Sequence, residues 1–284
     1  MASKYYPTGA RTFAKVVNVQ GVLVMRLGHM VAFLVRALVS IPLTLRHYRK
    51  EFLRILSDVT WGNGSIVVGG GTAGVIIVLG AAAGALVAIE GYQALHLLGL
   101  EPATGMVAST AVTRELAPIM ASLAFAAQAG CRFTAQLGAM RISEEIDAME
   151  ALAIRPIPYL VTTRLLASIV AIVPLYLACL TLNYVTVQLI VGFSSGMPAG
   201  TYEHYFRLVL GGTDVLYSLA KAIIFVIVTS TIQCYYGFYA AGGPQGVGTA
   251  AGRAMRASIS AMIVLNLLLT MAFWGVGTGA RLGG

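Results

Sequence analysis

The run Arg141-Ile-Ser-Glu-Glu-Ile-Asp-Ala-Met-Glu-Ala-Leu-Ala-Ile-Arg-Pro156 holds four of the chain's eleven carboxylates within seven residues, at 144, 145, 147 and 150. Apolar stretches on both sides of it are long enough to cross a bilayer. Ser143 is suited to cap a helix N-terminus, acids just after a cap favour the positive end of the helix dipole, and Pro156 ends the segment. We therefore expect a short acidic helix, at about residues 143–153, between two membrane spans.

This acidic helix has the features of a docking element. Ile146, Met149 and Ala153 share one face, and the carboxylates are distributed around the remainder. Such a helix can insert its apolar edge into a groove on a cytosolic partner while its acids meet basic residues there. The alternative is a solvated loop helix without a partner. The candidate docking residues are Ser143, Glu144, Glu145, Ile146, Asp147, Ala148, Met149 and Glu150.

The composition places the chain in a membrane. Hydrophobic residues make up 58% and charged residues 11%, against about 25% charged in soluble domains, and the mean hydropathy is +0.81. The net charge of +8 does not indicate nucleic-acid binding, because the basic residues lie mostly beside apolar spans and not around aromatic stacking residues. The cysteines and histidines lack metal-ligand spacing, and the glycine-rich runs lack the Gly-Lys-Ser/Thr of a phosphate-binding loop. We expect no metal and no cofactor in this chain.

We expect an all-α integral membrane protein with five transmembrane helices and the acidic helix between the second and the third. The apolar stretches predict spans at about 65–89, 103–134, 165–193, 215–237 and 258–277, joined by the polar or Gly/Pro-containing segments 90–102, 194–213 and 240–256. Gly80 and Gly84 have the small-xxx-small spacing of closely packed membrane helices.

Residues 1–60 form a separate basic region. Between residues 22 and 41, Arg26, His29 and Arg36 fall within about 80° of one another at 100° per residue, opposite a broad apolar face. This pattern predicts an amphipathic helix in the membrane interface. The alternative is a poor transmembrane helix, in which two arginines would cost several kcal/mol.

The distribution of lysine and arginine predicts the orientation. Nine basic residues precede the first span, four surround the acidic helix and two precede the last span, whereas the opposite side holds only Arg207 and Arg281. Because basic residues accumulate on the cytosolic side, we expect a cytosolic N-terminus, a cytosolic acidic helix and an external C-terminus.

The second predicted span contains charges, in Arg114-Glu115-Leu116-Ala117-Pro118. Arg114 lies about eleven residues from the outer end, or roughly 16 Å at 1.5 Å per residue. Pro118 has no amide hydrogen for the Arg114 carbonyl, so the helix should weaken or kink there. These residues either line a polar patch in an enclosed cavity or form a structural ion network. Lys221 in the fourth span could extend outward to the interface or neutralise Glu115.

A known family carries many of these residues in this order. The matching residues are Arg114-Glu-Leu-Ala-Pro-Ile119, Ala129-Gly130, Thr134-Ala135, Leu137-Gly138, Met140-Arg-Ile-Ser-Glu-Glu-Ile-Asp-Ala-Met149, Asp214 and Lys221. From about residue 60 onward the chain resembles the MlaE/YrbE family, the permease subunits of ABC systems that move lipids with Mce-domain proteins. The Glu-Glu-Ile-Asp-Ala-Met form is most similar to the YrbE subunits of actinobacterial Mce systems.

The resemblance implies a function and a set of partners. Residues 61–284 would be the permease domain, with the acidic helix as the coupling helix on a cytosolic ATPase dimer that binds ATP and magnesium, so this chain would not itself be an enzyme. A second YrbE-like permease, in a heterodimer, and external Mce-domain proteins would complete the assembly in the inner membrane. The cargo would be a fatty acid, sterol or phospholipid, moved inward through a cavity near Arg114, Glu115, Leu116, Pro118 and Lys221.

Two positions depart from the family pattern. Gln128 and Gln136 stand where many relatives have an arginine and a glutamate, and we hypothesise that an ion pair was lost as a unit, as in one subunit of an asymmetric heterodimer. Two other functions remain open. One is an ion-coupled secondary carrier with Arg114, Glu115 and Lys221 as its charge relay, and the other is a non-transporting anchor for an Mce assembly.

Overall fold

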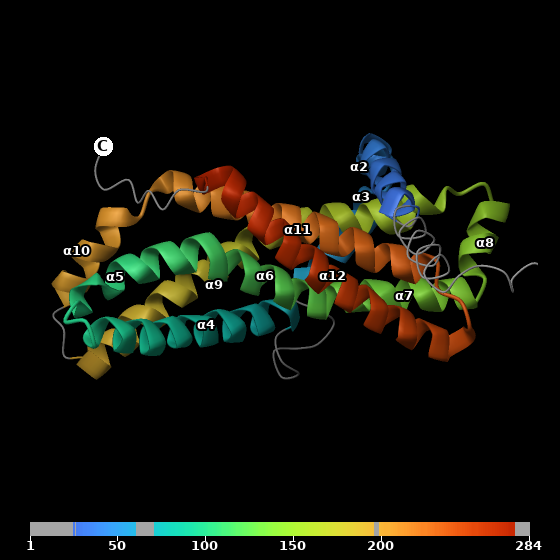
Figure 1. The fold of residues 1–284 in the computed structure, drawn as a ribbon. Coiled ribbons are helices and arrows are strands. Elements are labelled where there is room, and N and C mark those ends of the chain that lie inside the picture. The colour runs from blue at the N-terminus through green and yellow to red at the C-terminus, as the bar shows by residue number, and fades with distance from the viewer. Residues whose placement is uncertain (1–24, 26, 61–70, 196–198, 276–284) are drawn as a thin grey trace, which may run out of the picture.

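The structure is a computed structural model that describes residues 25, 27–60, 71–195 and 199–275, and these residues are almost entirely helical (Figure 1). Five helices in this part of the chain are long and apolar enough to cross a membrane, which confirms the predicted number of spans. They are α4 (Gly71–His96), the continuous helix Glu101–Ile142, the helix Ile157–Phe193 that contains most of α9 (Thr163–Ser195), α11 (Gly212–Phe238) and α12 (Gly243–Trp274).

Two of the spans approach each other closely because glycines remove side chains from their contact. α4 packs along α9, and a Cβ atom placed on Gly84 would lie 2.7 Å from the backbone oxygen of Asn183. One on Gly80 would lie 3.1 Å from the Cys179 Sγ atom. The predicted role of Gly80 and Gly84 in helix packing is therefore confirmed.

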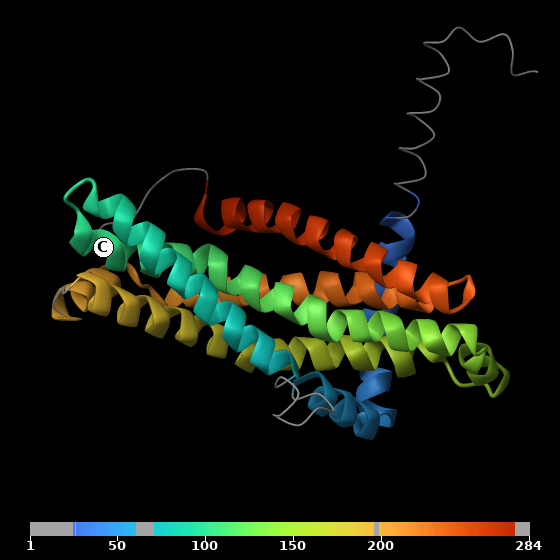
Figure 2. The same cartoon turned by 90° about the horizontal axis from the view of Figure 1, so that it is seen from below.

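α11 occupies the centre of the bundle. It packs against α12, against α9 and against α7 (Cys131–Ile142), the last part of the second span. Figure 2 shows α12 as the outermost of these long helices, and it buries the smallest share of its surface among the five spans. A polar side chain on the inner face of α11 can therefore reach the second span and α12 without meeting lipid.

The predicted boundaries of the last connecting segment are wrong. Residues 243–256, expected within a polar connection, are the first turns of α12. Gly242 and Gly243 adopt left-handed backbone at φ +93° and +68°, so the glycine pair makes the turn, and α12 starts at Gly243 with Pro244 in its first turn. Segment 194–213 lies between two spans as expected and contains the helix α10 (Ala199–Val209).

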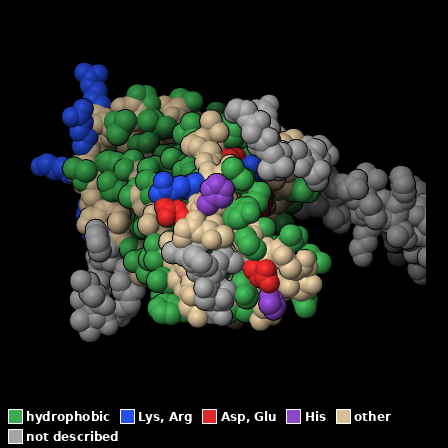
Figure 3. Space-filling model, turned by 90° about the vertical axis from the view of Figure 1, so that its left-hand side faces the viewer, with side chains coloured by type: hydrophobic (Ala, Val, Ile, Leu, Met, Phe, Trp, Pro, Cys, Tyr) green, Lys and Arg blue, Asp and Glu red, His purple; other side chains and the backbone are tan. Residues whose placement is uncertain are grey.

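α10 closes one end of the bundle. It packs on α5 (Thr104–Val107), the outer turn of the second span, where a Cβ atom on Gly105 would lie 2.6 Å from the Tyr202 oxygen. Figure 3 looks onto this end and shows its charged side chains in small mixed groups among hydrophobic ones. The pair Arg207–Glu203, at 2.5 Å, belongs to this end of the molecule.

The N-terminal helix, Leu27–Val39, is followed by α2 (Ile41–His47) at a bend of 44° and by α3 (Arg49–Thr60). Figure 2 shows this region running across the long axis of the spans, which is the arrangement expected of an interfacial helix. Phe33 and Ala37 are buried against the bundle, and the Thr162 hydroxyl donates a hydrogen bond to the Ala37 carbonyl at 3.0 Å.

Two members of the predicted basic stripe, His29 and Arg36, are both exposed, and Arg26 lies outside the described residues. The His29 Nδ1 atom also lies 2.8 Å from the Tyr235 hydroxyl of α11. This long-range contact was not predicted, because helical periodicity alone contains no information on where α11 lies.

Candidate functional site

The second span is one continuous helix that connects the Arg114–Glu115 pair to the acidic segment that follows Ile142. It runs from Glu101 to Ile142, 42 residues, or about 63 Å at 1.5 Å per residue. A bilayer core is about 30 Å thick, so this helix must tilt or extend beyond the membrane. Two π-helical segments, Ala108–Leu116 and Ala126–Gly130, interrupt its α-helical geometry. Arg114 and Glu115 lie at the end of the first segment.

Lys221 provides the Arg114 carbonyl with the hydrogen bond that Pro118 cannot donate. The ring nitrogen of Pro118 has no hydrogen to donate to that carbonyl. Instead, the Lys221 ammonium donates a hydrogen bond to it at 2.7 Å. A backbone oxygen left unpaired in the membrane interior would be costly, so Lys221 satisfies the group that the proline leaves free. The span stays continuous there and adopts the wider π-helical turn.

Arg114, Glu115, Asp214 and Lys221 form a charged cluster between the spans. Glu115 is the centre of its first part. Its Oε1 atom lies 3.4 Å from the Lys221 ammonium and accepts a hydrogen bond from the Thr270 hydroxyl at 2.7 Å. Its Oε2 atom accepts one from the Asn266 amide at 2.6 Å. The Lys221 side chain is 0% exposed, which excludes an outward extension to the interface. Of the two alternatives for Lys221, the structure has the one that neutralises Glu115.

Arg114 forms the second part of the cluster. Its guanidinium lies 3.3 Å from the Asp214 carboxylate at the start of α11. That carboxylate also accepts a hydrogen bond from the Trp274 indole at 2.5 Å. The indole ring lies 5.3 Å from the Arg114 guanidinium and 5.5 Å from the Lys221 ammonium, both within the range of cation–π attraction. The two cations and two carboxylates balance in charge, and they join the second span to α11 and α12.

Hydroxyl groups continue the cluster toward α9. The Tyr176 hydroxyl donates to the Ser218 oxygen at 2.7 Å, and Ser218 donates to the backbone oxygen of Thr113. The Thr113 hydroxyl in turn contacts that of Tyr184. Four spans therefore meet in one polar network, and a rotation of the second span would have to break its hydrogen bonds to α9, α11 and α12.

The contacts favour the ion-network interpretation of these charges over an open polar cavity. Each of the four ionised groups has an oppositely charged partner within the chain. Arg114 and Glu115 nevertheless keep 28% and 35% of their side-chain surface exposed, Leu116 is half-buried and Pro118 is buried. The cluster therefore keeps part of its surface open on the outside of this chain. In the described part of the chain, no group of three His, Cys, Asp or Glu side chains is arranged to hold a metal ion.

The acidic helix is shorter than predicted and begins differently. It is α8 (Glu145–Ala151), at the opposite end of the bundle from α10 (Figure 1). Ser143 does not cap it: this residue ends α7, and its hydroxyl donates to the Ala139 oxygen at 3.0 Å and to Glu145 at 2.9 Å. Glu144 precedes α8 in left-handed backbone at φ +60°. The turn into the helix is therefore made by strained backbone and not by a side-chain cap.

The apolar edge of α8 is used within the chain. Ile146 is completely buried and Met149 is half-buried against the same core, so the prediction that this edge inserts into a partner is wrong. Ala153 lies beyond the helix at φ +58°. The exposed face is acidic, and it consists of Glu144, Glu145, Asp147, Ala148 and Glu150. Asp147 pairs with Arg141 at 2.5 Å, so α8 is attached firmly to α7.

The hypothesis that an ion pair was lost at positions 128 and 136 stays a prediction. In this chain the Gln136 amide oxygen lies 3.2 Å from the Arg164 guanidinium of α9, so position 136 has a partner on another span. Arg164 is 7% exposed, and among the described residues its only other hydrogen-bond partner is the Leu160 carbonyl at 2.7 Å. A single buried cation thus remains opposite a neutral amide.

Comparison with known proteins identifies the family. The model described as Permease MlaE matches residues 63–272. The chain belongs to the MlaE permease family. This permease is 32% identical over 202 residues to a probable ABC transporter permease protein, RP096, of Rickettsia prowazekii (strain Madrid E), with 68% of this chain and 74% of that relative covered.

Two further relatives extend the range of similarity. The permease is 30% identical over 177 residues to the chloroplastic protein TRIGALACTOSYLDIACYLGLYCEROL 1 of Arabidopsis thaliana, with 62% of this chain and 51% of that protein covered. It is 23% identical over 204 residues to the intermembrane phospholipid transport system permease protein MlaE of Haemophilus influenzae, with 72% and 78% covered. The permease is accordingly a multi-pass membrane subunit of the ABC type and not an enzyme, and an ABC permease implies a separate ATPase partner.

Three residues of the charged cluster were not predicted from the sequence. Asn266, Thr270 and Trp274 provide a donor each to Glu115 or Asp214. They are spaced four residues apart in the permease's last span, so they share one helix face. The polar stripe that they form in an otherwise apolar span could have indicated a polar contact. It was overlooked because none of the three residues is charged.

Proposed function

We propose that this chain is the permease subunit of an ABC lipid transporter, and that α8 transmits the closure of a cytosolic ATPase dimer to the charged cluster. The observation that carries the proposal is the single helix Glu101–Ile142, which has exposed acids beyond one end and the cluster in its other half. Arg114 lies 28 residues before Ile142, or about 42 Å along the helix at 1.5 Å per residue.

The acidic face of α8 supports the docking role. Basic residues on an ATPase would meet Glu145, Glu150 and the exposed part of Asp147, which is 55% exposed despite its pair with Arg141. Because Ile146 anchors α8 to the bundle, a push on the acids would move α7 and would not simply unfold a loop. The second span and α9 would then tilt together, since α7 continues into α8 and the helix after it.

The exposed parts of the cluster support a role beside the lipid path. Tilting the second span would change how Arg114 and Glu115 face the cavity that we place at the junction with a second permease. Lipids have a charged headgroup and apolar tails, so a small neutral ion network inside an apolar wall allows passage without offering a strong binding site. Leu116 would contribute an apolar part of that wall.

The finer assignment follows the resemblance to the YrbE subunits. We propose a heterodimer with a distinct YrbE-like permease, with Mce-domain proteins on the α10 side and inward transport of a fatty acid, sterol or phospholipid. The names of the relatives from Haemophilus and Arabidopsis are consistent with a lipid cargo. The basic residues around α8 support a cytosolic position for that end, a cytosolic N-terminus and an external C-terminus in the inner membrane.

The docking role is tested by reversing charge on α8. The full chain carrying Glu145→Lys and Asp147→Lys would be pulled down from native membranes, and the co-purified ATPase and its lipid-stimulated hydrolysis measured. We expect both to be lost, because two reversed charges would repel the basic surface of the ATPase. Recovery of one permease species alone, active with the ATPase, would argue against a heterodimer.

A matched control reverses two acids at the opposite end. Glu203 is paired with Arg207 as Asp147 is with Arg141, and Glu90 is exposed like Glu145. The variant Glu90→Lys/Glu203→Lys should keep the ATPase and its response to lipid. If the α8 variant keeps them equally well while folded, α8 is a solvated helix and the proposed coupling is incorrect.

A further inference from the structure

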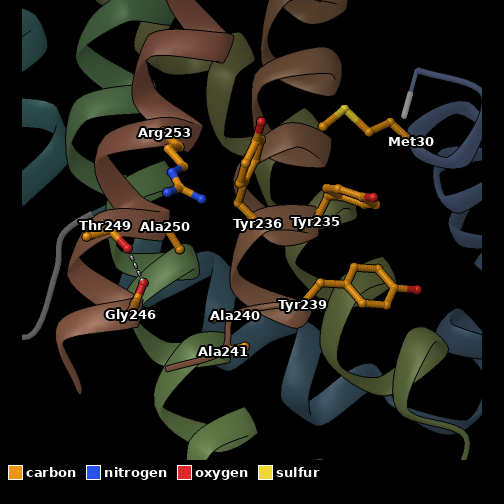
Figure 4. A pocket seen from close by; sticks show the side chains of 10 residues that line it. All are labelled: Met30, Tyr235, Tyr236, Tyr239, Ala240, Ala241, Gly246, Thr249, Ala250 and Arg253. Atoms are coloured by element: carbon orange, nitrogen blue, oxygen red, sulfur yellow. Dashed lines mark hydrogen bonds between the residues drawn. The ribbon is translucent and has the colours of Figure 1, made fainter. Parts of the chain in front are cut away.

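A pocket of about 280 Å³ lies where α11 ends and α12 begins, beside the N-terminal helix (Figure 4). Three tyrosines from the end of α11 and its following turn, Tyr235, Tyr236 and Tyr239, line it together with Met30 and Arg253. Figure 4 shows the Arg253 guanidinium turned toward the Tyr236 side chain, with Tyr235 and Tyr239 on the side of Met30. The pocket thus has a cationic side and an aromatic side.

Among the residues that the structure describes, Arg253 is the only charged one that lines this pocket. In the part of the chain that the structure describes, its guanidinium has no acidic partner and no hydrogen bond, and the Tyr236 hydroxyl has no hydrogen-bond partner either. The described lining of the pocket therefore contains two polar donors and no carboxylate. An anion with oxygen acceptors can accept hydrogen bonds from such donors.

The surroundings place this pocket at the level of lipid headgroups. Tyrosine and arginine are both enriched where a membrane helix meets the interface, and the N-terminal helix crosses the bundle at this level. His29 of that helix, bonded to Tyr235, fixes it against α11. Basic pockets between membrane helices on the cytosolic side are typical sites for anionic headgroups.

The size of the pocket limits what it can hold. Its volume of about 280 Å³ falls just below the roughly 300–1,000 Å³ of pockets that enclose drug-sized ligands. A phosphate-bearing headgroup fits such a space, whereas a whole lipid does not. The acyl chains would therefore lie outside the pocket, along the apolar surface of the helices.

We propose that this pocket binds the headgroup of an anionic phospholipid, held by Arg253 and Tyr236 at the end of the bundle opposite α10. The site is separate from the charged cluster, where no cation lacks a carboxylate. Its assignment to the inner leaflet rests on the orientation proposed above. Binding itself does not depend on that orientation, on transport or on an ATPase, so its test is independent of theirs.

The test measures lipid retention by the purified, delipidated full chain. Phosphatidylglycerol would be added and the bound lipid counted by native mass spectrometry for Arg253→Gln and for Arg256→Gln. Arg256 is an exposed arginine of the same helix that does not line the pocket, so its variant is matched in charge. We expect Arg253→Gln to weaken binding roughly tenfold, because a charge-assisted hydrogen bond is lost, and Arg256→Gln to leave it unchanged.

A second variant keeps the charge and the aromatic ring. Tyr236→Phe removes only the hydroxyl, and we expect a loss of roughly two- to fivefold. Equal weakening by Arg253→Gln and Arg256→Gln would overturn the proposal, since it would indicate general attraction to a basic surface. Equally tight binding of phosphatidylcholine would overturn the anionic preference. Binding of inorganic phosphate to the lipid-free chain with the same dependence on Arg253 would identify a free anion as the ligand and overturn the lipid assignment.

Discussion

Two buried cations of this permease are stabilised in different ways in the two halves of the bundle. Near the α10 end, Lys221 and Arg114 each face a carboxylate, and the group is neutral. Toward the α8 end, Arg164 faces the Gln136 amide and a carbonyl, with the Phe133 ring 5.9 Å from its guanidinium and with its Nε atom unpartnered. The first arrangement depends on ion pairs between spans, and the second on dipoles alone.

The difference predicts that the two regions respond differently to substitution. Removing one member of a buried ion pair leaves an uncompensated charge, whereas a cation held by dipoles already lacks a counter-charge. The cluster near α10 should therefore be sensitive to substitution. The site around Arg164 should instead tolerate, and even benefit from, an added carboxylate.

The largest expected effect comes from removing Lys221. The Lys221→Met variant leaves both Glu115 and the Arg114 carbonyl without their cation, so we expect a loss of about 3–5 kcal/mol of stability, as for other broken buried pairs. Thermal unfolding of the purified chain in detergent measures it. Lys50→Met, on the exposed surface of α3, is the control and should change little. Adding Glu115→Gln to Lys221→Met should recover part of the loss, and purely additive losses would argue against a coupled pair.

A smaller effect of the opposite sign is expected at Gln136. The Gln136→Glu variant places a carboxylate beside Arg164, and because hydrogen bonds to charged groups are stronger than neutral ones, we expect a gain of about 1 kcal/mol. Unfolding temperatures would be compared with those of Gln128→Glu, which adds the same charge to the same span away from Arg164. If both variants are destabilised alike, Arg164 does not have an unbalanced charge and the contrast between the two halves is lost.

An effect of similar size but opposite sign to that at Gln136 is expected at Trp274. The Trp274→Phe variant retains an aromatic ring near both cations but removes the indole donor to Asp214. The Arg114–Asp214 pair remains, so we expect a loss of about 1 kcal/mol, the contribution of one hydrogen bond. A loss as large as that of Lys221→Met would indicate that packing of the ring, and not the ion pairs, holds the three spans together.

The sequence allowed prediction of the features that depend on one segment alone. The five spans follow from the length of apolar stretches, and the close packing at Gly84 follows from small residues at a helical spacing. The acids of α8 were recognised because they cluster in a chain with few charges. The acids are exposed and Ile146 is buried because of the way α8 packs on the bundle. Local periodicity does not contain that information.

Features that depend on the relative rotation of two helices were not predictable. Lys221 could be assigned to Glu115 only once α11 was placed against the second span. The contact of Gln136 with Arg164 was not foreseen for the same reason, because it joins the second span to α9. The start of α12 at Gly243 was missed because glycine and proline are typical of turns and also of the first turn of a helix.

The π-helical segments of the second span make its length as important as its composition. Each π-helical turn corresponds to an α-helix with an extra residue, and a residue added or removed changes the direction of everything beyond it by about 100°. Deleting one residue between Ala108 and Thr113 would leave the charges intact but turn the outer end of the span, including Gly105, away from α10. Relatives that share every charged residue but differ by one residue in this segment would therefore present a different outer face.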